Sequence, residues 1–311
     1  MAAPPLTAAA PAARRSLPAR AWKWLREHGI VIYAGFAIAY MLIPIFIIAV
    51  FSFNDPAGKF NYTWQGFSLA TWEDPFALSA LTDSFLLSLR LAALSTLGAT
   101  ILGTLIALAL VRYEFFGRRT ANFLIVIPMA TPEVVIGAAL LSMFLLYFGP
   151  GILGFTSLLI AHIMFSISFV VVVVRSRLIG FDRSLEEAAR DLGASPFHTF
   201  RLVTLPLMLP GIVAAGLLAF ALSIDDFVIS NFNAGTAITF PLYIYGAAQR
   251  GIPVEIYVLA TMLFVVTVAA MILTVWQQRR AERMTATLPE AEEEPYAGTP
   301  AAPPVPGAAG G

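Results

Sequence analysis

Six long apolar stretches constrain this chain more than any other feature of its sequence. Each is long enough to cross the hydrocarbon core of a bilayer, which takes about 20 apolar residues in a helix. They are too long, and alternate too little, to be the strands of a membrane barrel. We therefore predict an all-α membrane protein with six transmembrane helices. The six stretches are Ile30–Phe53, Leu86–Val111, Phe123–Phe148, Ile152–Val174, Leu207–Ile229 and Val254–Trp276.

The composition excludes several classes of protein. Of the 311 residues, 59% are hydrophobic and 12% charged, whereas about a quarter of the residues in a soluble domain are charged. A soluble chain with this composition would lack the polar groups to cover its surface, so a soluble enzyme, a disordered protein and a nucleic-acid binder are excluded. The chain has no Cys, and His28, His162 and His198 lack metal-ligand spacing, so we predict no metal site.

The distribution of basic residues predicts the orientation of the chain. Sixteen of the 19 Lys and Arg residues fall in the N-terminal segment, the second and fourth loops and the C-terminal tail. The other three loops together hold two. Because cytoplasmic segments are enriched in Lys and Arg, both termini are expected to be cytoplasmic. The first stretch is too long for a signal peptide, and no cleavage site follows it, so it is expected to remain as a span.

The chain divides into three regions by composition. Residues 30–280 are expected to form the six-helix transmembrane domain. Residues 1–29 are expected to form a cytoplasmic segment that is partly disordered, because its beginning is rich in Ala and Pro. Residues 281–311 are rich in Ala, Pro, Gly and Glu. Such a segment has few side chains to bury and is expected to be a disordered tail.

The fourth loop, residues 175–206, carries a pattern typical of a short amphipathic helix. Ser184 and Glu187 have the spacing of a capping box, and Gly193 is placed to end the helix in a left-handed turn. A helix of about nine residues is marginal alone. It is expected to pack on a partner, on its own bundle or on lipid headgroups. Its apolar face would consist of Leu185, Ala188, Ala189 and Leu192.

The same loop resembles the EAA loop of ABC-importer permeases. In that family a Glu-Ala-Ala triplet is followed by three residues, a Gly, nine further residues and then Ile-x-Leu-Pro; here Val203 replaces the Ile. The resemblance implies a type I ABC importer permease fold, in which this loop forms a coupling helix that docks on a cytoplasmic ATPase. The residues it assigns to ATPase coupling are Glu187, Ala188, Ala189, Gly193, Leu205 and Pro206.

Further segments resemble the spermidine/putrescine permeases, and most of all the second permease subunit of that system. They are Trp64–Phe67, Thr131–Val135, Phe169–Val172, Arg175–Arg177, Ser223–Asp226, Pro241–Tyr245 and Val258–Thr261. The resemblance implies a multi-pass subunit of the bacterial inner membrane that imports polyamines and has no catalytic residues. The implied partners are a related second permease, two ATPase subunits and an extracytoplasmic binding protein. Import of iron, sulfate or thiamine and, more distantly, proton-coupled secondary transport are the alternatives.

ATP is expected to bind a partner, since this chain lacks the G-x-x-x-x-G-K-[ST] motif that cradles phosphates. The resemblance implies that ATP and Mg are held by the partner ATPase and that this chain has no cofactor of its own. The EAA loop also argues against a secondary transporter, which would have no use for it. A membrane-embedded hydrolase would need a nucleophile and base motif, which the sequence does not contain.

Ionisable residues inside membrane spans are costly and therefore mark candidate functional positions. Glu133 follows two prolines, Pro128 and Pro132, which are expected to kink or break the third span. It would line the pathway, cap the second half of the kinked helix or pair with a neighbour.

Two adjacent carboxylates, Asp225 and Asp226, lie near the outer end of the fifth span and would attract cationic substrates. One is expected to face a cavity and the other a neighbour; alternatively, the pair is solvated or bonds Arg90. Tyr243 and Tyr245 are possible cation–π partners, although interfacial aromatics are commonly membrane anchors. His162 is expected to make an interhelical hydrogen bond.

Overall fold

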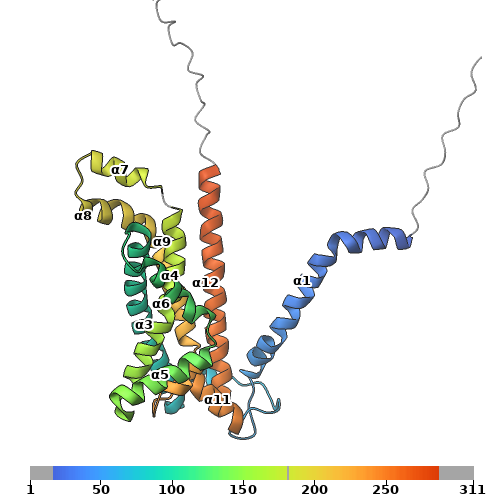
Figure 1. Cartoon of the computed structure of the whole chain (residues 1–311). Helices are drawn as coiled ribbons and strands as arrows, with labels where there is room; N and C mark the ends of the chain where they lie inside the picture. The colour runs from blue at the N-terminus through green and yellow to red at the C-terminus, as the bar shows by residue number, and fades with distance from the viewer. Residues whose placement is uncertain (1–16, 181, 287–311) are drawn as a thin grey trace, which may run out of the picture. The chain divides into compact units, whose positions relative to one another are not determined.

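A computed structural model describes residues 17–180 and 182–286 of the chain, and these residues are predominantly helical (Figure 1). The segments 1–16 and 287–311, where we expected disorder, lie outside the described residues. The helices are α1 (Leu17–Phe51), α2 (Ala70–Glu73), α3 (Ser79–Arg112), α4 (Arg118–Ala130), α5 (Glu133–Phe148), η1 (Pro150–Ile152), α6 (Phe155–Ile179), α7 (Ser184–Asp191), α8 (Pro196–Thr199), η2 (Phe200–Thr204), α9 (Leu205–Ile224), α10 (Val228–Asn233), α11 (Phe240–Arg250) and α12 (Val254–Ala286).

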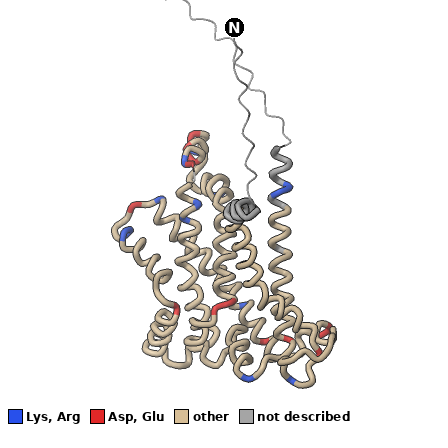
Figure 2. The backbone as a smooth tube through the Cα atoms, turned by 90° about the vertical axis from the view of Figure 1, so that its right-hand side faces the viewer, with Lys and Arg blue, Asp and Glu red and all other residues tan. Residues whose placement is uncertain are grey.

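Five of the described helices are long and apolar enough to span a membrane, or six spans result if the bent pair of α4 and α5 counts as one. The two meet at an angle of 110°. Thr131 precedes Pro132 and is extended, with ψ of 134°, because a residue before proline is pushed out of the helical region. The break expected from the prolines is therefore present. Charged positions are sparse along the long helices and gather at their ends and in the loops (Figure 2).

The core of the bundle is formed by α3, α6 and α9, which pack against one another. The buried face of α3 is rich in small residues, which let helix backbones approach closely in a membrane. A Cβ at Gly103 would lie 2.6 Å from Cγ1 of Val170 on α6, and one at Gly98 would lie 2.8 Å from Cδ1 of Ile163. The small residues of this buried face are Ser84, Ser88, Ala92, Ser95, Ala99, Gly103 and Ala107.

Short elements lie at the two ends of this core. The arm of α7 and α8 projects at one end, while α5 and α11 lie toward the other (Figure 1). A second apolar cluster joins α5, α6 and α10, with Phe144 buried at its centre. The segment from Ala260 onward forms a separate unit. In it α12 continues as one helix to Ala286, past the expected start of the C-terminal tail.

The fifth span ends five residues earlier than its apolar stretch. We expected it to run to Ile229, but α9 ends at Ile224 and a new helix, α10, begins at Val228. The two aspartates therefore lie at a break between helices and not within one. The break has a local cause, because the carboxylate of Asp226 accepts hydrogen bonds from the backbone N–H groups of Ile229 and Ser230 in the first turn of α10.

Candidate functional site

The arm between α6 and α9 consists of α7 and α8, joined by a turn at Gly193. Gly193 has φ of +86°, in the left-handed region that favours glycine. The N–H of Ala194 donates to the carbonyl of Ala189 at 3.0 Å, and that of Gly193 to the carbonyl of Arg190 at 2.9 Å. These bonds satisfy carbonyls that the end of the helix leaves free. The predicted left-handed turn is confirmed.

The N-terminus of α7 differs from the predicted capping box. Ser184 is the first helical residue, and its N–H donates to Oδ1 of Asp182 at 2.9 Å. The hydrogen bonds from Ser184 lower the pKa of Asp182. Because the helix starts one residue earlier than a Ser184 cap requires, Glu187 is not used in a box and its side chain remains exposed.

The face of α7 that turns toward the bundle is not the apolar one. Leu185 and Leu192 are 48% and 89% exposed, and Ala188 is exposed as well. Glu186, on the side of the helix away from these residues, is only 8% exposed. The expected apolar face does exist, but it points away from this chain and is left uncovered.

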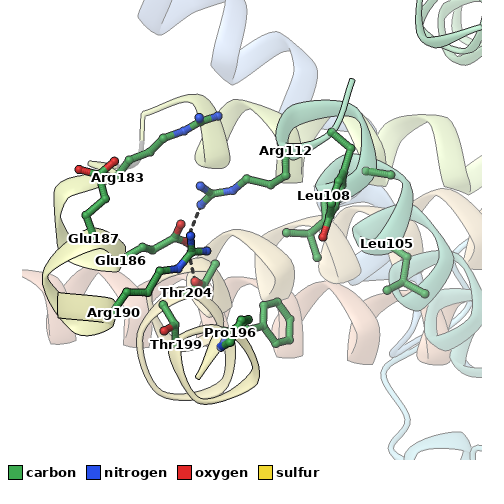
Figure 3. Close-up of a pocket in the computed structure, with 13 residues that line it drawn as sticks. Leu105, Leu108, Arg112, Arg183, Glu186, Glu187, Arg190, Pro196, Thr199 and Thr204 are labelled. Carbon is green, nitrogen blue, oxygen red and sulfur yellow. Dashed lines mark hydrogen bonds and ion pairs between the residues drawn. The ribbon is translucent and has the colours of Figure 1, made fainter. Parts of the chain in front are cut away.

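The carboxylate of Glu186 bonds to two other elements (Figure 3). Its Oε1 accepts hydrogen bonds from Nη2 of Arg112 and from Oγ1 of Thr204, both at 2.6 Å. Arg112 is the last residue of α3, and Thr204 is the last residue of η2. Loss of one partner from a buried pair of this kind typically costs about 3–5 kcal/mol, because a charge is left uncompensated. A cavity of about 530 Å³ lies beside this pair.

Leu205 and Pro206, the last residues of the loop motif, begin α9 directly after the π-helical turn η2. The N–H of Leu205 donates to the carbonyl of Phe200, five residues earlier. Pro206 has no N–H to donate and suits the first turn of a helix. The motif therefore marks the junction at which the arm joins the transmembrane bundle.

A buried polar network lies near the opposite end of α9. His162 on α6 contacts Oγ of Ser223 through Nδ1 at 2.7 Å and Oγ of Ser230 through Nε2 at 3.1 Å. Oγ of Ser223 also lies 2.9 Å from Oγ of Ser95 on α3. The expected interhelical bonding of His162 is confirmed, and the network joins α3, α6, α9 and α10.

The two adjacent aspartates have different surroundings. The side chain of Asp226 is 6% exposed, and its Oδ2 lies 3.5 Å from Nε2 of His162. It also accepts from the N–H groups of Ile229 at 3.2 Å and Ser230 at 2.8 Å. Asp225, the residue that directly follows α9, is exposed. Asp226 therefore stabilises the local fold, whereas Asp225 is accessible to solvent.

Arg90, considered as a partner of the two aspartates, stacks over the ring of Phe155, with its guanidinium carbon 5.0 Å from the ring centroid.

Of the two candidate tyrosines, Tyr245 contacts the residue that follows the two aspartates. Its ring centroid is 4.7 Å from that of Phe227, the residue after Asp226, and its side chain is 53% exposed. Tyr243, two residues earlier on α11, is half-buried. Phe227, which our sequence analysis did not select, adds a second aromatic ring to this site.

Glu133 is the first residue of α5 and is exposed. The helix dipole favours a carboxylate at this end. One turn later, the carbonyl of Gly137 accepts a hydrogen bond from Nδ2 of Asn233 on α10 at 3.3 Å. The start of α5 therefore packs beside α10, the helix that follows the two aspartates. Pro132, and not Glu133, is the N-cap residue of α5, and no side chain makes a capping hydrogen bond there.

These features define a multi-pass helical membrane protein of the transporter-permease class. The chain belongs to the family described as "Binding-protein-dependent transport system inner membrane component", which matches residues 99–284. Members of this family are permease subunits of the inner membrane and not enzymes.

Two permease proteins match this chain over most of its length. It is 39% identical, over 76% of its length and 91% of the relative's, to the spermidine/putrescine transport system permease protein PotC of Haemophilus influenzae. It is 36% identical, over 75% and 84%, to the putrescine transport system permease protein PotI of Escherichia coli.

The fold also matches that of solved transporters. A chain of a bacterial alginate ABC transporter, in complex with a periplasmic protein that binds an alginate pentasaccharide, superposes with a TM-score of 0.60. The two chains are 18% identical, and the match covers 86% of this chain and 98% of the other.

Proposed function

We propose that this chain is a transmembrane permease subunit that imports polyamines of the spermidine and putrescine type. The observation that carries the proposal is the similarity to PotC and PotI, which extends over most of each relative. The chain would form half of the pathway, and a related second permease would form the other half. A binding protein outside the membrane would deliver the substrate, and two ATPase subunits would bind ATP and Mg.

The arm of α7 and α8 supports the part of the proposal that concerns the ATPase. Leu185 and Leu192 are exposed on a short helix that is too small to be stable without packing. Exposed apolar residues rimmed by charged ones are typical of a protein interface. Glu187 and Gly193 lie on this exposed arm. We infer that its uncovered face docks on the ATPase, with Ala188 and Ala189 permitting close approach.

The break between α9 and α10 supports the polyamine part of the proposal. A polyamine is a flexible chain of ammonium groups, which bind carboxylates and the faces of aromatic rings. Asp225 is accessible and lies two residues before Phe227, whose ring contacts that of Tyr245. We infer that Asp225 and Tyr245 contact the cation as it passes. Glu133, at the start of the neighbouring α5, and Tyr243, two residues before Tyr245 on α11, are further contacts in this proposal.

Uptake in cells tests this proposal. The chain would be expressed with its source organism's second permease, ATPase and binding protein in a host that lacks its own polyamine importers. We expect uptake of labelled spermidine or putrescine that requires this chain and that an excess of unlabelled polyamine suppresses. If the host takes up no polyamine while the complex imports a different solute, the substrate assignment is wrong.

The orientation is tested by cysteine labelling, because the natural chain contains no Cys. Gly58 lies in the loop after α1, Phe116 lies in the loop between α3 and α4, and both are exposed. With cytoplasmic termini, a membrane-impermeant maleimide should label Gly58→Cys in spheroplasts with an intact inner membrane. Phe116→Cys should react only after permeabilisation. The opposite pattern would reverse the proposed topology.

A further inference from the structure

The connection between α7 and the bundle depends on one carboxylate. Oε1 of Glu186 is 2.6 Å both from Nη2 of Arg112 and from Oγ1 of Thr204. The side chains of Glu186 and Arg112 are 10% and 17% exposed, so the pair is largely shielded from water. Charge-assisted hydrogen bonds of this length are short and directional. They fix the position of α7 relative to both partners.

The two partners of Glu186 lie at the ends of the helices that form the core. Arg112 ends α3, and Thr204 immediately precedes Leu205, the first residue of α9. These two helices pack on each other along the bundle. A displacement of α7 that acts on Glu186 is therefore passed to both helices at once.

An open space lies between α7 and α3 beside this pair. The cavity of about 530 Å³ is lined by Leu105, Leu108 and Arg112 of α3 on one side and by Glu186 and Arg190 of α7 on the other (Figure 3). The α3 side of this space is mainly apolar and the α7 side is charged, so the two faces do not pack directly on each other. The pair formed by Glu186 and Arg112 crosses this space, so it connects α7 to α3 where the two helices do not pack.

We propose that Glu186, Arg112 and Thr204 form a coupling joint, which transmits movement of α7 to α3 and α9 during transport. The proposal rests on the proposed function, in which an ATPase moves α7. The three residues are positioning residues that contact neither substrate nor ATP. Without the joint, α7 would still move with the ATPase, but its movement would not displace α3 and α9. ATP would then be hydrolysed without import.

The test compares uptake with ATP hydrolysis in proteoliposomes that contain the complete complex. We expect Glu186→Gln and Arg112→Gln to keep ATPase stimulation by the loaded binding protein within about twofold. The ratio of substrate imported to ATP hydrolysed should fall about 10-fold, within the range of coupling energies measured between contacting residues. Thr204→Val should lower the ratio less, because a neutral donor is lost. Arg119→Gln, at an exposed arginine near the same end of the bundle, is the matched control and should leave it unchanged.

A double variant makes the test decisive. If Glu186 and Arg112 act as one joint, combining the two substitutions should lower the ratio no further than the worse single variant. Losses that multiply, or single variants with an unchanged ratio, would overturn the joint. Yield and thermal unfolding of each complex identify any variant that fails to assemble. Failure of the natural complex to import polyamine would instead refute the proposed function. This uptake is measured separately from the ratio in the variants.

Discussion

Replacing Glu187 with arginine is expected to reduce ATP-dependent polyamine uptake about 100-fold while leaving the protein inserted in the membrane. The carboxylate is exposed on the same arm as the uncovered Leu185 and Leu192. In the proposed interface it would pair with a cationic group of the ATPase. Loss of one member of a buried interfacial charge pair costs about 2–5 kcal/mol, and a reversed charge adds repulsion. The measurement is uptake of labelled spermidine by the assembled complex.

A matched control separates this effect from a general change of charge. Glu114 lies in the loop after α3, and its side chain is 95% exposed. The variant Glu114→Arg changes the net charge by the same amount near the same end of the bundle. Its uptake should stay within about twofold of the natural chain, as for most exposed substitutions. Normal uptake by Glu187→Arg would show that the arm does not dock through this residue.

The variant Asp225→Asn is expected to raise the KM for polyamine uptake about 10- to 100-fold. Asp225 is accessible directly after α9 and lies two residues before Phe227, whose ring contacts that of Tyr245. A hydrogen bond to a charged group contributes about 1.5–3 kcal/mol, and the amide retains the shape of the carboxylate without its charge. The fold should be unaffected, because the side chain of Asp225 is not buried. Initial uptake rates against polyamine concentration measure the effect.

The neighbouring aspartate is expected to respond differently. Asp226 caps α10 and contacts His162, so Asp226→Asn should lower the thermal stability of the complex as well as its uptake. The variant Asp55→Asn, at an exposed aspartate in the loop after α1, is the control for loss of one negative charge. An unchanged KM in Asp225→Asn would remove this residue from the pathway.

The spanning helices follow directly from the sequence, because a helix in hydrocarbon must satisfy its backbone hydrogen bonds within itself. The break before Glu133 was predictable in the same way, since Pro132 lacks an N–H. The break after Ile224 was not. It depends on the carboxylate of Asp226 bonding the N–H groups of α10 while His162 approaches from α6. A local apolar pattern carries no information about such contacts.

The arm shows the same limit at the candidate site. Its left-handed turn was predictable, because Gly193 tolerates a conformation that a Cβ disfavours. The direction of its faces was not, since a helix whose apolar side meets another protein has the same pattern as one that packs on its own bundle. Glu186 next to Glu187 gave no signal of burial. Its role depends on Arg112 and Thr204, which are distant in sequence and converge only in the fold.

The most direct test of the central claim is import into proteoliposomes that contain this chain with its partner permease, ATPase and binding protein. ATP would be enclosed in the vesicles, and the loaded binding protein added outside. Polyamine should accumulate inside with ATP but not with a non-hydrolysable analogue, and a proton ionophore should have no effect. Accumulation that needs no ATP and collapses with the ionophore would contradict the account and indicate a secondary transporter.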